Sequence, residues 1–426
     1  MKKTLRRAWS NQFVKGGLLI TASSFLANVL NYFFNVLSAR ALGPAGFGEI
    51  SALFSYTAVF SIPMMVMSLV IINKIGSKGE SARGFSGALQ DWFVLKLRRW
   101  WFLSVPALII IPFVPGLTNL APVSGYALVP FIFLNFLLAF YTAIVQGLQL
   151  FLWAAFIGLL TALIKLTGAF AVAGGLSGLT TIIVALLFSA LVPLIVAYLI
   201  LRRHTSTKPR ASDAINKRLA HAVLNKYVIF TFISILAITL FNNADVIFVK
   251  KFFTAQDAGI YGSWSLFAKI ILYVMGPLSL VSFIFFSDKK SSHSHENILL
   301  VTLGILLAVG GASFVFYRFF SLEVIRILFG NKFEPVSPYL ATASIFGSAY
   351  TTSSFINNYF LAKNSKFSLI LAACIPVYFA LLFFIPRNIK AIITLNMYFS
   401  LAVMLFYLVA YGFLIFYNGA NGKKKG

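Results

Sequence analysis

Residues 25–56 read FLANVLNYFFNVLSARALGPAGFGEISALFSY, and this stretch indicates the fold class. Two apolar runs, near 15–38 and 48–72, flank the short segment around ALGPAG. Each run has the ~20 mostly apolar residues that a membrane-spanning helix needs. The stretch therefore predicts two spanning helices joined by an outward-facing hairpin.

The composition of the whole chain agrees with a membrane protein. Of its 426 residues, 60% are hydrophobic and 11% are charged, and the mean hydropathy is +0.90. A soluble domain is ~25% charged and ~45–50% apolar, so this chain is not a soluble globular enzyme, a disordered protein or a fibrous repeat. A single cysteine, Cys374, excludes a disulfide framework and a multi-cysteine metal site.

Apolar stretches of spanning length recur along the chain. Lipid offers no hydrogen bonds to the backbone, so helices are expected, and the absence of two-residue alternation argues against a β-barrel. We therefore predict an all-α polytopic membrane protein with twelve transmembrane helices in two six-helix lobes around a central cavity. The expected spans are 15–38, 48–72, 100–118, 124–146, 151–174, 177–201, 227–249, 258–286, 298–319, 337–360, 366–386 and 391–417.

An internal repeat indicates the two lobes. Residues 45–54 read AGFGEISALF and residues 258–267 read AGIYGSWSLF, half a chain length apart. Parallel repeats of this kind are typical of transporters that move two bundles around a central site. The expected division is an N-terminal lobe at 1–201, a cytosolic linker at 202–226 and a C-terminal lobe at 227–426.

The charges predict the orientation of the helices. Lys and Arg number 35 and Asp and Glu number 10, which gives a net charge of +25. Basic residues collect in cytosolic loops of membrane proteins, and most of them fall on one set of alternating segments if the N-terminus is cytosolic. We expect a multi-pass protein of the cytoplasmic (inner) membrane with both termini cytosolic. This role of the basic residues leaves no reason to expect a nucleic-acid partner.

A few ionisable residues inside or at the ends of the spans need a separate explanation. Lys165 and Lys269 lie near the middle of their spans, Asp245 lies about one turn from the outer end of its span, and Arg40 closes the first span. Such residues are costly in lipid and usually face a partner or a cavity. Two lysines in a watery cavity, helped by Arg40, would bind a phosphate, and Asp245 would carry a coupling proton or sodium ion.

Structural interpretations of the same residues remain open. Arg40 and Glu49 can form an interfacial ion pair across the hairpin, and Asp245 can pair with Lys250 or Lys251. Asparagines in helical bundles usually join helices. This interpretation applies to the asparagines of the first and seventh spans, which are Asn31, Asn35, Asn242 and Asn243.

Motifs of the common enzyme classes are absent from the sequence. It contains no GxxxxGK[ST] phosphate loop, no HExxH and no CxxC. No two acidic residues lie together on an expected outer loop. We therefore expect no cofactor other than a coupling ion, no metal site and no enzymatic activity.

Three stretches resemble a known family. Residues 25–56, residues 242–271 (NNADVIFVKKFFTAQDAGIYGSWSLFAKII) and residues 324–340 (VIRILFGNKFEPVSPYL) are similar to polysaccharide-exporting flippases, the Wzx-type O-antigen translocases. Their superfamily, the multidrug/oligosaccharidyl-lipid/polysaccharide exporters, also contains lipid II flippases and multidrug antiporters. The resemblance implies a cavity open to one face at a time. It also maps the family's helix-seven aspartate onto Asp245 and its ARALGP turn onto Arg40 to Pro44.

The implied function is that of a flippase in polysaccharide biosynthesis, such as lipopolysaccharide O-antigen assembly. Its cargo would be a polyprenyl-pyrophosphate-linked oligosaccharide, and other polysaccharide-assembly proteins would be its partners. Pro63 and Pro277 occupy comparable places in the two halves and are candidate bending points for gating. The alternatives are a multidrug/cation antiporter of the same superfamily and a membrane polysaccharide polymerase or ligase.

Overall fold

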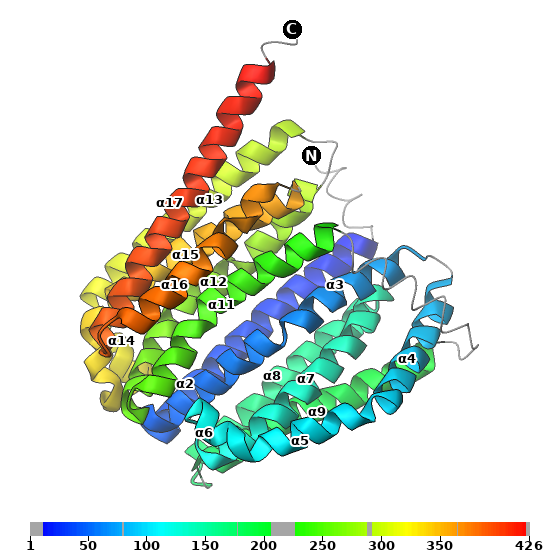
Figure 1. Ribbon diagram of the computed structural model, residues 1–426, viewed down its shortest axis with the longest axis horizontal. Coiled ribbons are helices and arrows are strands. Elements are labelled where there is room, and N and C mark those ends of the chain that lie inside the picture. The colour runs from blue at the N-terminus through cyan, green and yellow to red at the C-terminus, as the bar shows by residue number, and fades with distance from the viewer. Residues whose placement is uncertain are drawn as a thin grey trace. The chain divides into compact units, whose positions relative to one another are not determined.

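The computed structural model describes residues 12–78, 81–176, 178–205, 226–287, 292–363 and 365–422. The regular structure in these ranges is helical, without a β-strand (Figure 1). Nine helices of the described chain are long and apolar enough to cross a membrane. These observations confirm an all-α polytopic membrane protein, while the count of twelve spans stays a prediction.

The first helical element, α2 (Gln12–Phe60), contains the expected hairpin. Its helical path is broken at Gly43, whose φ of 70° lies in the left-handed region that favours glycine. The rings of Phe34 and Phe54 lie 6.0 Å apart, whereas a straight helix would separate them by ~30 Å. The chain therefore doubles back at Gly43, so α2 includes the first expected span and the beginning of the second, which continues in α3 (Ile62–Gly76).

The chain forms two compact units. Unit 1 comprises Met1–Leu42 and Leu53–Ile229, and unit 2 comprises Gly43–Ala52 and Phe230–Gly426. The hairpin segment Gly43–Ala52 thus belongs to unit 2, although it falls in the expected N-terminal lobe. Residues 206–225, most of the expected linker, lie outside the described residues, so the linker stays a prediction.

Unit 1 is built from helices that pack through small residues and aromatic rings. Gly168 of α8 faces Ala185 of α9 so closely that a Cβ on Gly168 would collide with it, and Phe93 of α4 stacks on Phe140 of α7. In a membrane the hydrophobic effect does not drive helices together, because lipid is as apolar as the side chains. Small residues allow the close packing that holds the helices together instead. The helices of this unit after α2 are α3 (Ile62–Gly76), α4 (Ala82–Arg99), α5 (Ser104–Ile110), α6 (Val114–Thr118), α7 (Pro122–Gly147), α8 (Phe151–Ala173) and α9 (Gly178–His204).

The expected single span at 100–118 is wrong. The helix begins earlier, at Ala82, because α4 buries a face that runs from Phe85 to Phe93. It then breaks into the short helices α5 and α6, with 3₁₀ turns at Trp101–Leu103 and Ile111–Phe113. Prolines 106, 112 and 115 lie in this region, and proline removes a backbone donor and disrupts a continuous helix.

Unit 2 packs around α15. This helix is buried along most of its length, and its Gly347 would clash with the backbone carbonyl of Ala268 in α12 if it carried a Cβ. The close approach of these two backbones fixes the position of the segment that carries Lys269. The helices are α11 (Lys226–Phe252), α12 (Ala255–Ser287), α13 (Ser292–Phe319), α14 (Ser321–Leu328), α15 (Leu340–Ala362), α16 (Ile370–Phe384) and α17 (Ile389–Gly422).

The two copies of the internal repeat contact each other within unit 2. A Cβ on Gly48 would lie 2.9 Å from the backbone nitrogen of Gly259, and a Cβ on Gly259 would collide with the carbonyl of Pro44. The buried ion pair between Lys250 and Glu49, at 2.6 Å, holds the same segment against α11. The repeat is therefore a helix-crossing motif that requires small residues.

We predict that Gly259→Ala destabilises the protein, because the added methyl group meets the Pro44 backbone rather than a flexible side chain. Overpacking of this kind costs ~1–3 kcal/mol. The melting temperature of the purified protein in detergent should fall. Gly304→Ala in α13 is the control, since no atom lies near its Cβ position; equal melting temperatures for the two variants would contradict the prediction.

Candidate functional site

Asp245 lies at the centre of a buried polar network in unit 2. One carboxylate oxygen, Oδ2, accepts hydrogen bonds from the Tyr261 hydroxyl and from Asn396 Nδ2 at 3.2 Å. Asn396 Nδ2 also lies 2.5 Å from the Tyr261 oxygen, and Tyr378 donates to Asn396 Oδ1 at 2.6 Å. The four side chains come from α11, α12, α16 and α17, and each is almost completely buried.

Part of this network is open to a further ligand. Oδ1 of Asp245 and Oδ1 of Asn242 are both buried without a hydrogen-bond partner. The two residues are three positions apart on α11, so their side chains lie on neighbouring parts of one helix face. Carboxylate and amide oxygens are ligands for a hard cation, and a carboxylate also binds a proton. Within the described chain, no group of three or more His, Cys, Asp or Glu residues could hold a metal ion.

Lys269 lies on α12, ~12 Å along the helix axis from Tyr261. Its ammonium group and the Asp245 carboxylate attract each other electrostatically, yet they form no ion pair. The side chain is half-buried. Unit 2 thus carries a cation whose charge no contacting carboxylate of the described residues neutralises.

Lys165 lies in unit 1 on α8. Its Nζ donates to Asn31 Oδ1 at 3.4 Å and lies 5.4 Å from the centre of the Phe54 ring. Both partners belong to α2, one on each arm of the hairpin. An amide oxygen and an aromatic face stabilise the ammonium group without cancelling its charge, so Lys165 also keeps its positive charge available.

The remaining predicted site residues lie elsewhere in the two units. Arg40 is exposed and lies ~14 Å along the helix axis from Asn31. Pro63 occupies the first turn of α3, directly after the break at Ser61 that separates α3 from α2. Pro277 falls within α12, but its side chain is outside the described residues. The functional roles of all three stay predictions.

Two of the expected ion pairs, Arg40 with Glu49 and Asp245 with Lys250 or Lys251, are not the contacts that the structure shows. Glu49 pairs with Lys250 rather than with Arg40, and Asp245 contacts Tyr261 and Asn396 rather than Lys250 or Lys251. The interpretation of the asparagines holds for Asn31, which links α2 to α8. By contrast, the amides of Asn35 and Asn243 donate to carbonyls of their own helices.

Sequence reasoning missed Tyr261, Tyr378 and Asn396. A signal existed for two of them, because Tyr261 lies inside the repeat AGIYGSWSLF and Asn396 interrupts an otherwise apolar span. Tyr378 carried no such signal, since tyrosine is common at membrane interfaces.

Comparison with protein families gives one match. The family described as "Polysaccharide biosynthesis protein" matches residues 13–288. No curated protein matches the chain.

The fold recurs in solved transporter structures. The chain is similar to a lipid II flippase, MurJ, in an inward closed conformation, with a TM-score of 0.67 and 16% identity over 93% of this chain and 87% of that chain. It is also similar to an inward-facing multidrug resistance MATE family transporter, with a TM-score of 0.65 and 13% identity over 92% and 98%. A third similar structure is a MOP superfamily transporter from Pyrococcus furiosus, with a TM-score of 0.59 and 14% identity over 93% and 96%.

These likenesses, at 13–16% identity, show the fold of the chain. The solved structures named above are described as a flippase and as transporters.

We predict that Tyr261→Phe destabilises unit 2, because the Asp245 carboxylate loses one of its two hydrogen-bond donors. Leaving a buried polar group short of a partner costs ~1–3 kcal/mol. The measurement is the melting temperature in detergent. Tyr398→Phe is the control, since Tyr398 is exposed on the same helix as Asn396. Equal melting temperatures for Tyr261→Phe and Tyr398→Phe would show that the Tyr261 hydrogen bond does not stabilise unit 2.

Proposed function

Because this chain belongs to the polysaccharide biosynthesis protein family, we propose that it is a flippase for a lipid-linked oligosaccharide. It carries a polyprenyl-pyrophosphate-linked oligosaccharide across the cytoplasmic membrane by alternating access, with both termini cytosolic. The observation that carries the proposal is that Lys165 and Lys269 lie in apolar helices and neither forms an ion pair with a described carboxylate.

The electrostatics of these two lysines favour an anionic cargo. A positive charge in surroundings of low dielectric constant attracts an anion more strongly than it would in water. Hydrogen bonds between ammonium groups and phosphate oxygens are short and strong because both partners are charged. A pyrophosphate offers several such oxygens, so Lys165 and Lys269 would bind the head of the cargo, and Arg40 would attract it at the hairpin end.

A lipid tail explains how such a cargo crosses the membrane. The charged head would be bound by the lysines while the polyprenyl chain stays in the bilayer, where its burial needs no protein cavity. The likeness in fold to a protein described as a lipid II flippase supports a lipid-borne cargo.

Asp245 would couple transport to an ion gradient. Its buried Oδ1 has no hydrogen-bond partner, and a proton or a sodium ion would supply the missing contact. Binding of a cation there would reduce the attraction between Asp245 and Lys269. The ammonium group of Lys269 would then be freer to bind the pyrophosphate, which links ion binding to cargo binding.

A drug/cation antiporter is the second candidate, because the fold is also that of MATE family transporters. A site for organic cations requires carboxylates without a neighbouring positive charge. In unit 2 the buried carboxylate of Asp245 lies in the field of Lys269, which repels such a substrate. The flippase is therefore the better-supported function.

We predict that Lys165→Met and Lys269→Met each reduce flipping about ten-fold or more, the effect of losing one charged hydrogen bond of ~1.5–3 kcal/mol. The measurement follows a fluorescent polyprenyl-pyrophosphate oligosaccharide that crosses proteoliposome membranes. Lys390→Met is the control, because Lys390 is exposed at the start of α17.

Full flipping by both lysine variants would contradict the cationic site. The same proteoliposomes, loaded with a cationic dye, test the alternative. Dye efflux that survives in the two lysine variants and fails in Asp245→Asn would identify an antiporter instead.

We predict that Asp245→Asn abolishes the dependence of flipping on the coupling-ion gradient, because the amide cannot bind a proton or sodium ion as a carboxylate does. Rates with imposed proton and sodium gradients are compared in proteoliposomes. Asp257→Asn in the first turn of α12 is the control. Gradient-driven flipping by Asp245→Asn at the normal rate would show that the ion binds elsewhere.

A further inference from the structure

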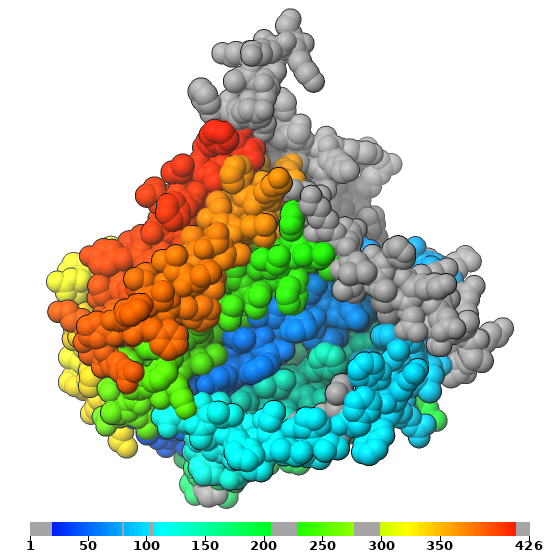
Figure 2. Space-filling model, viewed as in Figure 1, coloured from blue at the N-terminus to red at the C-terminus, as the bar shows by residue number. Residues whose placement is uncertain are grey.

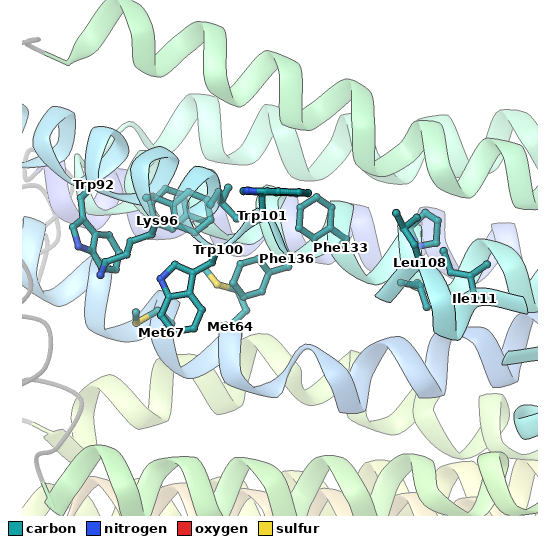
Figure 3. A pocket seen from close by; sticks show the side chains of 15 residues that line it. Met64, Met67, Trp92, Lys96, Trp100, Trp101, Leu108, Ile111, Phe133 and Phe136 are labelled. Atoms are coloured by element: carbon teal, nitrogen blue, oxygen red, sulfur yellow. The ribbon is translucent and has the colours of Figure 1, made fainter. Parts of the chain in front are cut away.

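Unit 1 contains an elongated cavity of about 910 Å³ between α3, α4, α5 and α7 (Figure 3). Its lining is apolar and aromatic, and Lys96 is the charged side chain among the described lining residues. A volume of this size is within the ~300–1,000 Å³ range of pockets that hold small organic ligands. The function proposed above makes no use of this cavity.

The cavity forms where the helix that begins with α4 is interrupted before α5. Stacking of Phe93 on Phe140 holds α4 against α7, but the helix is interrupted at Trp101–Leu103. Beyond the break α5 stands away from α7, so that Leu108 is 63% exposed although it lines the cavity. In the space-filling view, α5 and α6 form a cyan band at the margin of the unit (Figure 2).

The two ends of the cavity differ in chemistry. At one end lie Trp92 and Lys96 of α4 and Trp100, which directly follows the helix, at four-residue spacing (Figure 3). Arg98 and Arg99 lie in the same last turn of the helix. Clusters of tryptophan with lysine and arginine mark a membrane–water interface. The other end, around Leu108 and Ile111, is lined by apolar side chains (Figure 3).

On its α7 side the cavity is about as long as one leaflet of a bilayer. This lining runs from Phe140 to Val129, which is ~16 Å along the helix, whereas the opposite lining runs from Trp92 to Ile111 and is longer. Half of the hydrocarbon core of a bilayer is ~15 Å. An acyl chain that begins at the tryptophan and lysine end would therefore reach Leu108 and Ile111 at the bilayer midplane. A polyprenyl chain is much longer than this lining.

We propose that this cavity is a binding site for an anionic diacyl phospholipid. The phosphate of the lipid contacts Lys96, which forms no ion pair with a described carboxylate, and one acyl chain fills the space between α5 and α7. Basic pockets between spanning helices are suited to anionic headgroups. The bound lipid supplies the packing partner that α5 lacks, and the proposal does not depend on the identity of the cargo.

Quenching of tryptophan fluorescence by lipids with brominated chains tests the site directly, because three of the six tryptophans line the cavity. The full chain, with Trp9 and Trp153 replaced by Phe to lower the background, is reconstituted in phosphatidylcholine vesicles. Increasing amounts of brominated phosphatidylglycerol or brominated phosphatidylcholine are then compared. We expect half-maximal quenching at an about five-fold lower fraction of the anionic lipid, the preference that one lysine contact gives.

Two variants separate the site from general attraction to the membrane. Lys96→Gln should remove the five-fold preference, whereas Arg99→Gln should keep it, because Arg99 is exposed and does not line the cavity. Val129→Phe, which fills the hydrocarbon end, should reduce quenching by both lipids. Elution by size-exclusion chromatography verifies that each variant is folded.

Three results would overturn the proposal. Equal quenching by the two lipids would show a gap filled by bulk lipid, and equal loss of preference in Lys96→Gln and Arg99→Gln would show surface attraction only. Displacement of brominated phosphatidylglycerol by a lower fraction of polyprenyl phosphate would show that the cavity holds a polyprenyl chain.

Discussion

The cost of placing polar and charged groups among apolar helices governs this structure. An ionisable side chain near the middle of a membrane-spanning helix costs ~2.5–3.5 kcal/mol on insertion scales. Some such groups here have partners that offset this cost. Glu49 and Lys250 neutralise each other in the interior of unit 2, and one oxygen of Asp245 receives two donors.

The groups left without a full set of partners are therefore informative. Lys165 has an amide oxygen and an aromatic face but no carboxylate, and Lys269 has the field of Asp245 but no ion pair with it. Because such lysines do little for stability, we propose a ligand of opposite charge as the reason for their placement. The same reasoning underlies the proposals of a cation at Oδ1 of Asp245 and of an anionic lipid at Lys96.

The sequence predicted those features that depend on local composition. Hydropathy located the spanning helices, and the short segment around ALGPAG marked the reversal that the structure places at Gly43. The break of the 100–118 span was missed because the apolar residues there satisfy the length of a helix. The helix instead begins earlier because α4 buries one of its faces, and it is interrupted later where the prolines lie.

The partners of the charged residues could not be predicted, because they depend on tertiary structure. Proximity in sequence favoured Arg40 for Glu49, but the segment Gly43–Ala52 packs in unit 2, where Lys250 lies. Likewise, Asn396 reaches Asp245 across 151 positions of the chain. The candidate residues were identified by their chemistry alone, and their environment emerged from the fold.

Equilibrium binding of polyprenyl lipids to the purified protein, measured by native mass spectrometry, shows whether Lys165 and Lys269 select the cargo by the charge of its headgroup. Polyprenyl pyrophosphate, polyprenyl monophosphate and neutral polyprenol share a tail and differ in headgroup charge. If uncompensated lysines select the cargo, affinity falls in that order and the differences disappear in the Lys165→Met/Lys269→Met double variant. Equal affinity for all three lipids in the unmodified protein would contradict the account.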